Sequence, residues 1–190
     1  MTSGSEVATA SSALPHLVLS VVTAVTLALA LAFEPAEPGI MQRPPQPPKQ
    51  PLMTRPLVWR VFYVSVLMAA ITLLAFEFEM ARGSAEDVAR TAAVNALVCG
   101  EIFYLFNARR FTASALTVDT LTGNRVVWIV IGVLVVLQLA LTYLPFLQGI
   151  FGTAPLGLVT WAFILALGLA KFFAVELEKF LWRRAGVHRM

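Results

Sequence analysis

One acidic side chain, Glu101, stands inside a run of apolar residues long enough to cross a lipid bilayer. A carboxylate that faced lipid at such a position would cost roughly 2.5–3.5 kcal/mol or more. Intramembrane acids therefore normally face the interior of a helix bundle, where they mark ion pathways. The alternative is a protonated Glu101 that hydrogen-bonds a neighbouring helix. Glu101 is thus the leading candidate for a residue that binds a cation.

Other polar side chains inside the apolar runs have simpler interpretations. Asn95 and Gln138 are predicted to make hydrogen bonds between helices, each worth about 1 kcal/mol or less. Ser20 and Thr23 lie three residues apart, so they share one helical face, and small hydroxyl residues are common where membrane helices meet. Lys171 is expected to extend its charge toward the cytoplasmic interface. No metal site is assigned, since the two histidines lie at opposite ends of the chain.

The composition is that of a membrane protein. Of 190 residues, 58% are hydrophobic and only 13% are charged, whereas soluble domains carry roughly 25% charged residues. A soluble fold with so few charges could not cover its surface. The basic residues flank apolar runs instead of lining one face, which argues against a nucleic-acid partner. The lipid bilayer is the partner that the composition predicts.

Apolar segments predict an all-α membrane protein built as a bundle of five transmembrane helices. A spanning helix needs about 20 mostly apolar residues, and five segments qualify: residues 14–33, 57–78, 89–108, 126–147 and 156–178. Residues 1–13 are small and polar and are expected to be disordered. Residues 79–88 and 148–155 are expected to form short links, and 185–190 a tail.

Basic residues indicate the orientation of this bundle. They concentrate in the predicted loops 34–56 and 109–125 and in the C-terminal segment, which share one side if there are five spans. The other side carries only Arg82 and Arg90, offset by acidic residues. We therefore expect the N-terminus outside and the C-terminus in the cytoplasm of a multi-pass protein of the plasma (inner) membrane.

A proline-rich loop, residues 34–56, joins the first two predicted spans. Proline fixes φ and removes the N–H donor, so residues 44–51 favour a stiff polyproline II conformation. On physical grounds alone this is a stiff linker. The ordered string FEPAEPGIMQRPPQPPKQPL, residues 33–52, also closely resembles the loop after the sixth membrane helix of P-type cation-transporting ATPases, particularly their calcium-pump branch.

A second stretch carries the same resemblance. ARTAAVNALVCGEIFYLFNARR, residues 89–110, is similar to the eighth membrane helix of that family, and the last two predicted spans look like its ninth and tenth helices. The resemblance implies that residues 14–184 correspond to the last five membrane helices of such a pump. It also implies that Glu101 matches a cation-coordinating glutamate of the family.

The resemblance extends to the first predicted span, with one departure. The sixth helix of the family carries Asn-x-x-Thr-Asp, whose oxygens bind the cation. Here Ser20 replaces the Asn, Thr23 is retained, and Ala24 replaces the Asp. Calcium prefers six to eight oxygen ligands, several of them anionic. The family pattern therefore implies cation-pathway candidates at Glu101, Thr23 and Ser20, with a site of lower charge that suits a monovalent ion better.

The catalytic motifs of the family are missing from the sequence. We find no Asp-Lys-Thr-Gly-Thr phosphorylation motif, no nucleotide-binding domain and no Thr-Gly-Glu actuator loop. We therefore expect no enzyme activity and no cofactor in this chain, with ATP and Mg²⁺ acting only through domains that it lacks.

Three functions remain open at this point. The first is the C-terminal membrane part of a cation pump, which contributes part of the ion pathway and pairs with a separate pump fragment or other membrane subunit. The second is a non-catalytic bundle, either a truncated remnant or an assembly partner, with no transport of its own. An unrelated small channel or transporter is the third, and the proline-rich loop argues against it.

Overall fold

The computed structural model describes residues 55–108 and 125–184, together with seven helical residues nearer the N-terminus: Val21, Thr23, 25–28 and Ala32. Several predictions fall outside the described residues. They concern residues 1–13, Ser20, most of the proline-rich loop, residues 109–124 and the tail at 185–190.

Four helices of the described part are long and apolar enough to cross a membrane. They are α2 (Arg55–Ala81), α3 (Glu86–Ala108), α5 (Arg125–Tyr143) and α7 (Leu158–Arg184), and a short helix α6 (Pro145–Phe151) precedes the last of them. No strand occurs among the described residues. The all-α class is therefore confirmed for this part of the chain, whereas the fifth span and the orientation stay predictions.

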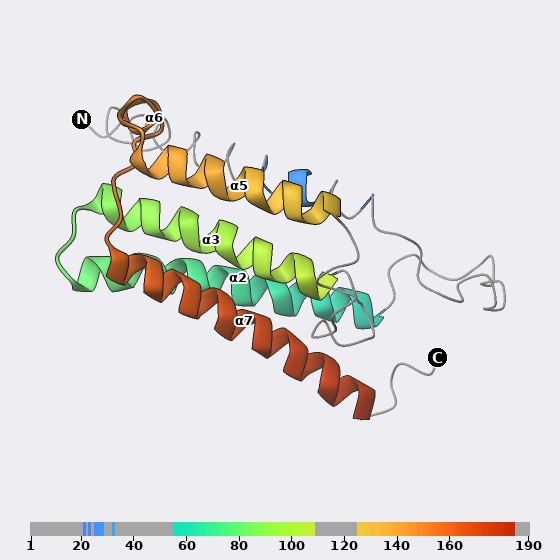
Figure 1. The fold of residues 1–190 in the computed structure, drawn as a ribbon. Coiled ribbons are helices and arrows are strands. Elements are labelled where there is room, and N and C mark those ends of the chain that lie inside the picture. The colour runs from blue at the N-terminus through green and yellow to red at the C-terminus, as the bar shows by residue number, and fades with distance from the viewer. Residues whose placement is uncertain are drawn as a thin grey trace, which may run out of the picture.

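The link between α2 and α3 is shorter than predicted because α2 runs on to Ala81. Gly83 has a positive φ of 75°, a conformation that glycine adopts without steric cost. The Gly83 N–H donates to the Met80 carbonyl and the Ser84 N–H to the Glu79 carbonyl, which closes the helix end. The chain then reverses, so that α3 runs antiparallel to α2 (Figure 1).

The prediction of one continuous helix over residues 126–147 is wrong. Helix α5 ends at Tyr143, Leu144 is extended with φ −80° and ψ 117°, and α6 begins at Pro145. Proline disfavours the helical conformation of the residue before it and lacks an N–H donor, which explains the break. Helix α6 then ends at Gly152, whose φ is 63°. Much of the predicted link 148–155 is thus helical.

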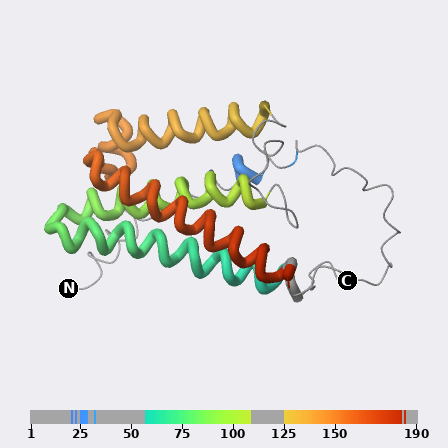
Figure 2. The backbone as a smooth tube through the Cα atoms, turned by 60° about the horizontal axis from the view of Figure 1, so that its bottom comes forward, coloured from blue at the N-terminus to red at the C-terminus, as the bar shows by residue number. Residues whose placement is uncertain are grey.

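Helices α2, α3 and α7 lie side by side, and α5 lies on the outer side of α3 (Figures 1 and 2). The contact among the three is lined by small and branched residues: Ala75, Ala92, Ala96, Leu156 and Ile164. Small residues let membrane helices approach closely. A second apolar cluster joins the N-terminal helix to α3 and α5 through Leu27, Leu105, Val127, Ile131 and Leu134.

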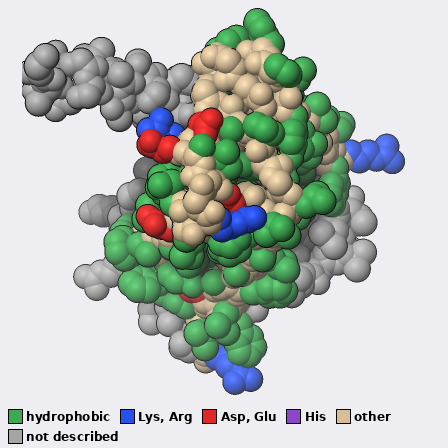
Figure 3. All heavy atoms as spheres, turned by 90° about the vertical axis from the view of Figure 1, so that its left-hand side faces the viewer, with side chains coloured by type: hydrophobic (Ala, Val, Ile, Leu, Met, Phe, Trp, Pro, Cys, Tyr) green, Lys and Arg blue, Asp and Glu red, His purple; other side chains and the backbone are tan. Residues whose placement is uncertain are grey.

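The outward faces of the long helices are apolar. Phe62 and Leu73 on α2, Ile129 and Val136 on α5, and Leu177 on α7 are each more than half exposed, as expected of surfaces that meet lipid. Figure 3 looks at the end of the bundle that holds the α2–α3 link, and it shows a few acidic and basic side chains scattered among hydrophobic side chains and exposed backbone. Several other charged side chains, among them Glu79, Lys171 and Lys179, are buried inside the bundle.

Candidate functional site

Glu101 lines a cavity of about 270 Å³ between α3, α2 and the N-terminal helix. The other lining residues are Leu27, Ala28, Met68, Tyr104, Leu105 and Ala108. Its Oε2 atom is buried and has no hydrogen-bond partner among the described residues. Buried polar atoms in proteins nearly always have a partner, so an exception calls for a missing ligand, water or ion. The carboxylate is thus available to an ion or proton in this cavity.

Thr23 lies on the side of the N-terminal helix that reaches this cavity. It is four residues before Leu27, which lines the cavity, so the two share one helical face. Thr23 is only 2% exposed. Ser20 is outside the described residues, so the predicted set of Glu101, Thr23 and Ser20 can be placed only for its first two members. Its role in a cation pathway stays a prediction.

The prediction that Lys171 reaches the cytoplasmic interface is wrong. Lys171 is 2% exposed and turns inward from α7. Its Nζ atom donates to the carbonyl oxygen of Gly100 at 3.0 Å and to the Met68 sulfur at 2.8 Å, and it lies 5.1 Å from the centre of the Tyr104 ring. The reason is depth: Lys171 is near the middle of the 25-residue span Leu158–Trp182, roughly 16 Å or more from either end.

Gly100 makes this arrangement possible. A Cβ atom at Gly100 would lie 2.5 Å from Cδ1 of Ile71, 3.1 Å from the Met68 sulfur and 3.6 Å from Nζ of Lys171. Without a side chain there, α2 approaches α3 closely and the Lys171 ammonium reaches a backbone carbonyl. Sequence reasoning missed this contact because it joins residues 71 positions apart.

Asn95 makes an interhelical contact on another side of α3. Its Nδ2 atom donates to the Thr142 hydroxyl on α5 at 3.2 Å and to the Thr91 carbonyl at 2.9 Å. Gln138 is 8% exposed and, with Asn95, lines a second cavity of about 270 Å³ between α3, α5 and α7. Within the described part of the chain, no other helix supplies a hydrogen-bond partner to its side-chain amide. Its predicted interhelical bond stays a prediction.

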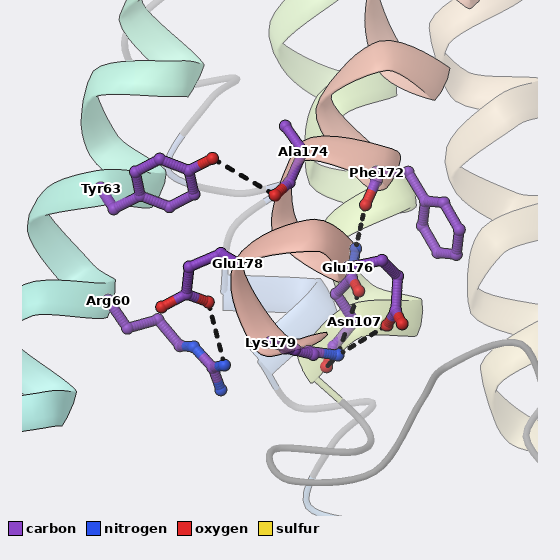
Figure 4. A network of polar contacts seen from close by, with 8 residues as sticks. All are labelled: Arg60, Tyr63, Asn107, Phe172, Ala174, Glu176, Glu178 and Lys179. Atoms are coloured by element: carbon purple, nitrogen blue, oxygen red, sulfur yellow. Dashed lines mark hydrogen bonds and ion pairs between the residues drawn. The ribbon is translucent and has the colours of Figure 1, made fainter. Parts of the chain in front are cut away.

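A polar network near the C-terminal end of α7 ties three helices together (Figure 4). Lys179, 1% exposed, donates to the carbonyl and side-chain oxygens of Asn107 at 2.9 and 3.0 Å and pairs with Glu176 at 3.1 Å. Nearby, Arg60 of α2 pairs with Glu178 at 3.2 Å. Lys179 belongs to the basic C-terminal segment that the sequence predicts to be cytoplasmic, but its side chain is buried between helices. The sequence signal for this network is the presence of Glu176, Glu178 and Lys179 close together in an otherwise apolar helix.

At the opposite end of the bundle, Glu79 fastens α2 to α7. It is 2% exposed. The Thr160 hydroxyl donates to its Oε1 atom at 2.7 Å and the Ser84 hydroxyl to Oε2 at 2.6 Å, while Arg82 lies 3.4 Å away. Glu79 is the first residue of the predicted link 79–88, and sequence reasoning missed its contact because Thr160 lies 81 residues further along the chain. Both carboxylate oxygens of Glu79 accept hydrogen bonds within the protein, and the bond from Thr160 holds α2 against α7.

Comparison with known proteins agrees with this arrangement. Residues 12–181 match the family model described as "Cation transporting ATPase, C-terminus". The chain is 42% identical over 167 residues to the probable cation-transporting ATPase F of Mycobacterium tuberculosis, which covers 87% of this chain and 18% of that protein. It is 32% identical over 152 residues to the cation-transporting ATPase pma1 of Synechocystis, covering 77% of this chain and 17% of that protein.

A plant relative extends the match. Over 155 residues the chain is 32% identical to the plasma membrane-type calcium-transporting ATPase 5 of rice, which covers 76% of this chain and 14% of that protein. The chain thus spans less than a fifth of the length of these curated relatives. It is a multi-pass membrane protein by its four apolar helices and its family. The chain belongs to the cation-transporting P-type ATPases and represents their C-terminal membrane region.

Proposed function

We propose that this chain supplies the C-terminal part of the ion pathway of a P-type cation pump, with Glu101 as its ion-binding carboxylate. The observation that carries the proposal is the buried Oε2 atom of Glu101, which has no hydrogen-bond partner among the described residues and faces a cavity of about 270 Å³. Thr23, and Ser20 on the same predicted helical face, would add hydroxyl oxygens.

Five spans, with the N-terminus outside and the C-terminus in the cytoplasm, fit this role. Two features of the N-terminal helix support a fifth span. Its described residues are all helical, and Leu27 belongs to the apolar cluster that includes α3 and α5. The distribution of Lys and Arg supports the orientation. The plasma (inner) membrane is the location that we propose.

ATP hydrolysis belongs to other domains in this proposal. The sequence contains no phosphorylation or nucleotide-binding motif, and the proposed partner is a pump fragment or other membrane subunit that supplies them. ATP and Mg²⁺ would act only there. The second candidate is a non-catalytic bundle without transport. The hydrogen bonds of Glu79 and Lys179 at the two ends of the bundle favour this second candidate, because they join helices and lie outside the Glu101 cavity.

Equilibrium binding of cations tests the proposal. The chain is reconstituted in lipid nanodiscs, and binding of radioactive sodium, rubidium and calcium ions is measured. Saturable binding of at least one of these ions is expected, with loss in Glu101→Gln. Glu79→Gln is the matched control, since it neutralises a buried carboxylate outside the cavity and should leave binding intact. No saturable binding, or binding that survives Glu101→Gln, would favour the non-catalytic bundle.

A further inference from the structure

Most charged side chains inside the described bundle have an oppositely charged partner. Arg60 pairs with Glu178 at 3.2 Å, Lys179 with Glu176 at 3.1 Å, and Glu79 with Arg82 at 3.4 Å. Glu101 and Lys171 are the two inward-facing charged residues of the described part that have no ion pair within 4 Å. One is an acid and the other a base, and both lie in the middle of their bundle, at the level of Gly100.

Glu101 lines the cavity, and Lys171 contacts two of its other lining residues. The Lys171 ammonium contacts Met68 and the ring of Tyr104, and both residues line the cavity together with Glu101. None of the direct contacts of the Lys171 ammonium carries a negative charge, since they are a backbone carbonyl, a thioether and an aromatic face. The Lys171 charge therefore lies behind the Met68 and Tyr104 side of the cavity, at the carbonyl of the residue that precedes Glu101.

An isolated charge inside a membrane bundle is costly, and an opposite charge nearby offsets that cost. Coulomb attraction falls off slowly where the surroundings are apolar, so two charges need not touch to stabilise each other. Here an ionised Glu101 and a protonated Lys171 bring the net charge of the cavity to zero. Neither the carbonyl nor the sulfur bound by Lys171 could do this.

We propose that Lys171 is a built-in cation of the Glu101 cavity, which balances the carboxylate and selects monovalent over divalent ions. This rests on the proposed ion pathway through Glu101. Calcium takes six to eight oxygen ligands, among them carboxylate oxygens, and the described residues offer one carboxylate here and no group of three acidic, histidine or cysteine ligands. With Lys171 in place, a bound divalent ion would leave an excess of two positive charges, whereas a monovalent ion leaves one.

Infrared spectroscopy of the charge state tests the pairing without any bound cation. In the wild-type chain at neutral pH, Glu101 is expected to be ionised, so the Glu101→Gln difference spectrum should lack the carbonyl stretch of a protonated carboxyl group. In Lys171→Met that stretch should appear, and it should vanish again in Lys171→Met with Glu101→Gln. Lys171→Arg should behave as the wild type.

A matched control removes another buried ammonium. Lys179→Met should leave the spectrum of Glu101 unchanged, because Lys179 pairs with Glu176. A protonated Glu101 in the wild type, or an ionised Glu101 in Lys171→Met, would overturn the proposal. If Lys171→Met fails to fold, a protonated Glu101 in the wild-type difference spectrum would still overturn the proposal.

Ion binding then tests selectivity. In the nanodisc assay, Lys171→Met should bind calcium at least tenfold more tightly relative to sodium or rubidium than the wild type does. An unchanged ratio would refute selection by Lys171. If the infrared result holds but no cation binds, the ion pathway fails while the pairing stands. If cations bind through Glu101 but its infrared band is the same in the wild type and in Lys171→Met, the ion pathway stands and the role of Lys171 as a built-in cation is wrong.

Discussion

Gly100→Ala is the sharpest test of how α2, α3 and α7 pack. The new methyl group would lie 2.5 Å from Cδ1 of Ile71 and 3.1 Å from the Met68 sulfur, both well inside van der Waals contact. Overpacking of this kind costs about 1–3 kcal/mol. Alanine also improves helix propensity by about 1 kcal/mol. The net expectation is a loss of up to about 2 kcal/mol in the free energy of unfolding, since Ile71 and Met68 can adjust in part.

Gly132→Ala on α5 is the matched control. A Cβ atom at Gly132 has nothing within 4 Å, so only the propensity gain of about 1 kcal/mol applies. Unfolding in mixed micelles with increasing dodecyl sulfate, followed by the loss of helical circular dichroism, gives both values. Steric packing predicts that Gly100→Ala is the less stable of the two by about 1–3 kcal/mol. Equal stability of the two variants would refute the close approach of α2 to α3.

Two further substitutions test the polar contacts at the ends of the bundle. Lys179→Met removes the ammonium that bonds Asn107 and Glu176, and loss of these buried contacts should lower the free energy of unfolding by about 1–3 kcal/mol. The same dodecyl sulfate titration measures it, and an unchanged stability would contradict the network. Thr160→Val removes a donor to buried Glu79 and should cost about 1–3 kcal/mol, a loss that should disappear when Glu79 is already Ala and has no oxygen to accept the bond.

The spans were predictable because length and apolar composition are local properties. Helices α2, α3 and α7 contain the predicted segments 57–78, 89–108 and most of 156–178. The inward position of Glu101 followed from the cost of a carboxylate in lipid. The break at Leu144 was also within reach, since Pro145 stands in the sequence and proline biases the residue before it.

The inner contacts of the charges were not predictable. Lys171 binds a carbonyl on another helix that is accessible because Gly100 has no side chain. Glu79 binds Thr160, which lies 81 residues further along the chain. Such pairs depend on the rotation of each helix about its axis, and neither hydropathy nor charge counting reports that rotation. The proline-rich loop lies mostly outside the described residues, so its predicted shape stays a prediction.

Direct observation of an ion beside Glu101 tests the central claim. Crystals of the chain grown in a lipidic phase and soaked with rubidium or thallium would reveal a bound monovalent ion by its anomalous scattering. We expect one peak in the cavity lined by Leu27, Met68 and Glu101, at coordination distance from the Glu101 Oε2 atom and lost in Glu101→Gln crystals. An empty cavity, or a peak that persists without the carboxylate, would contradict the assignment of Glu101 to the ion pathway.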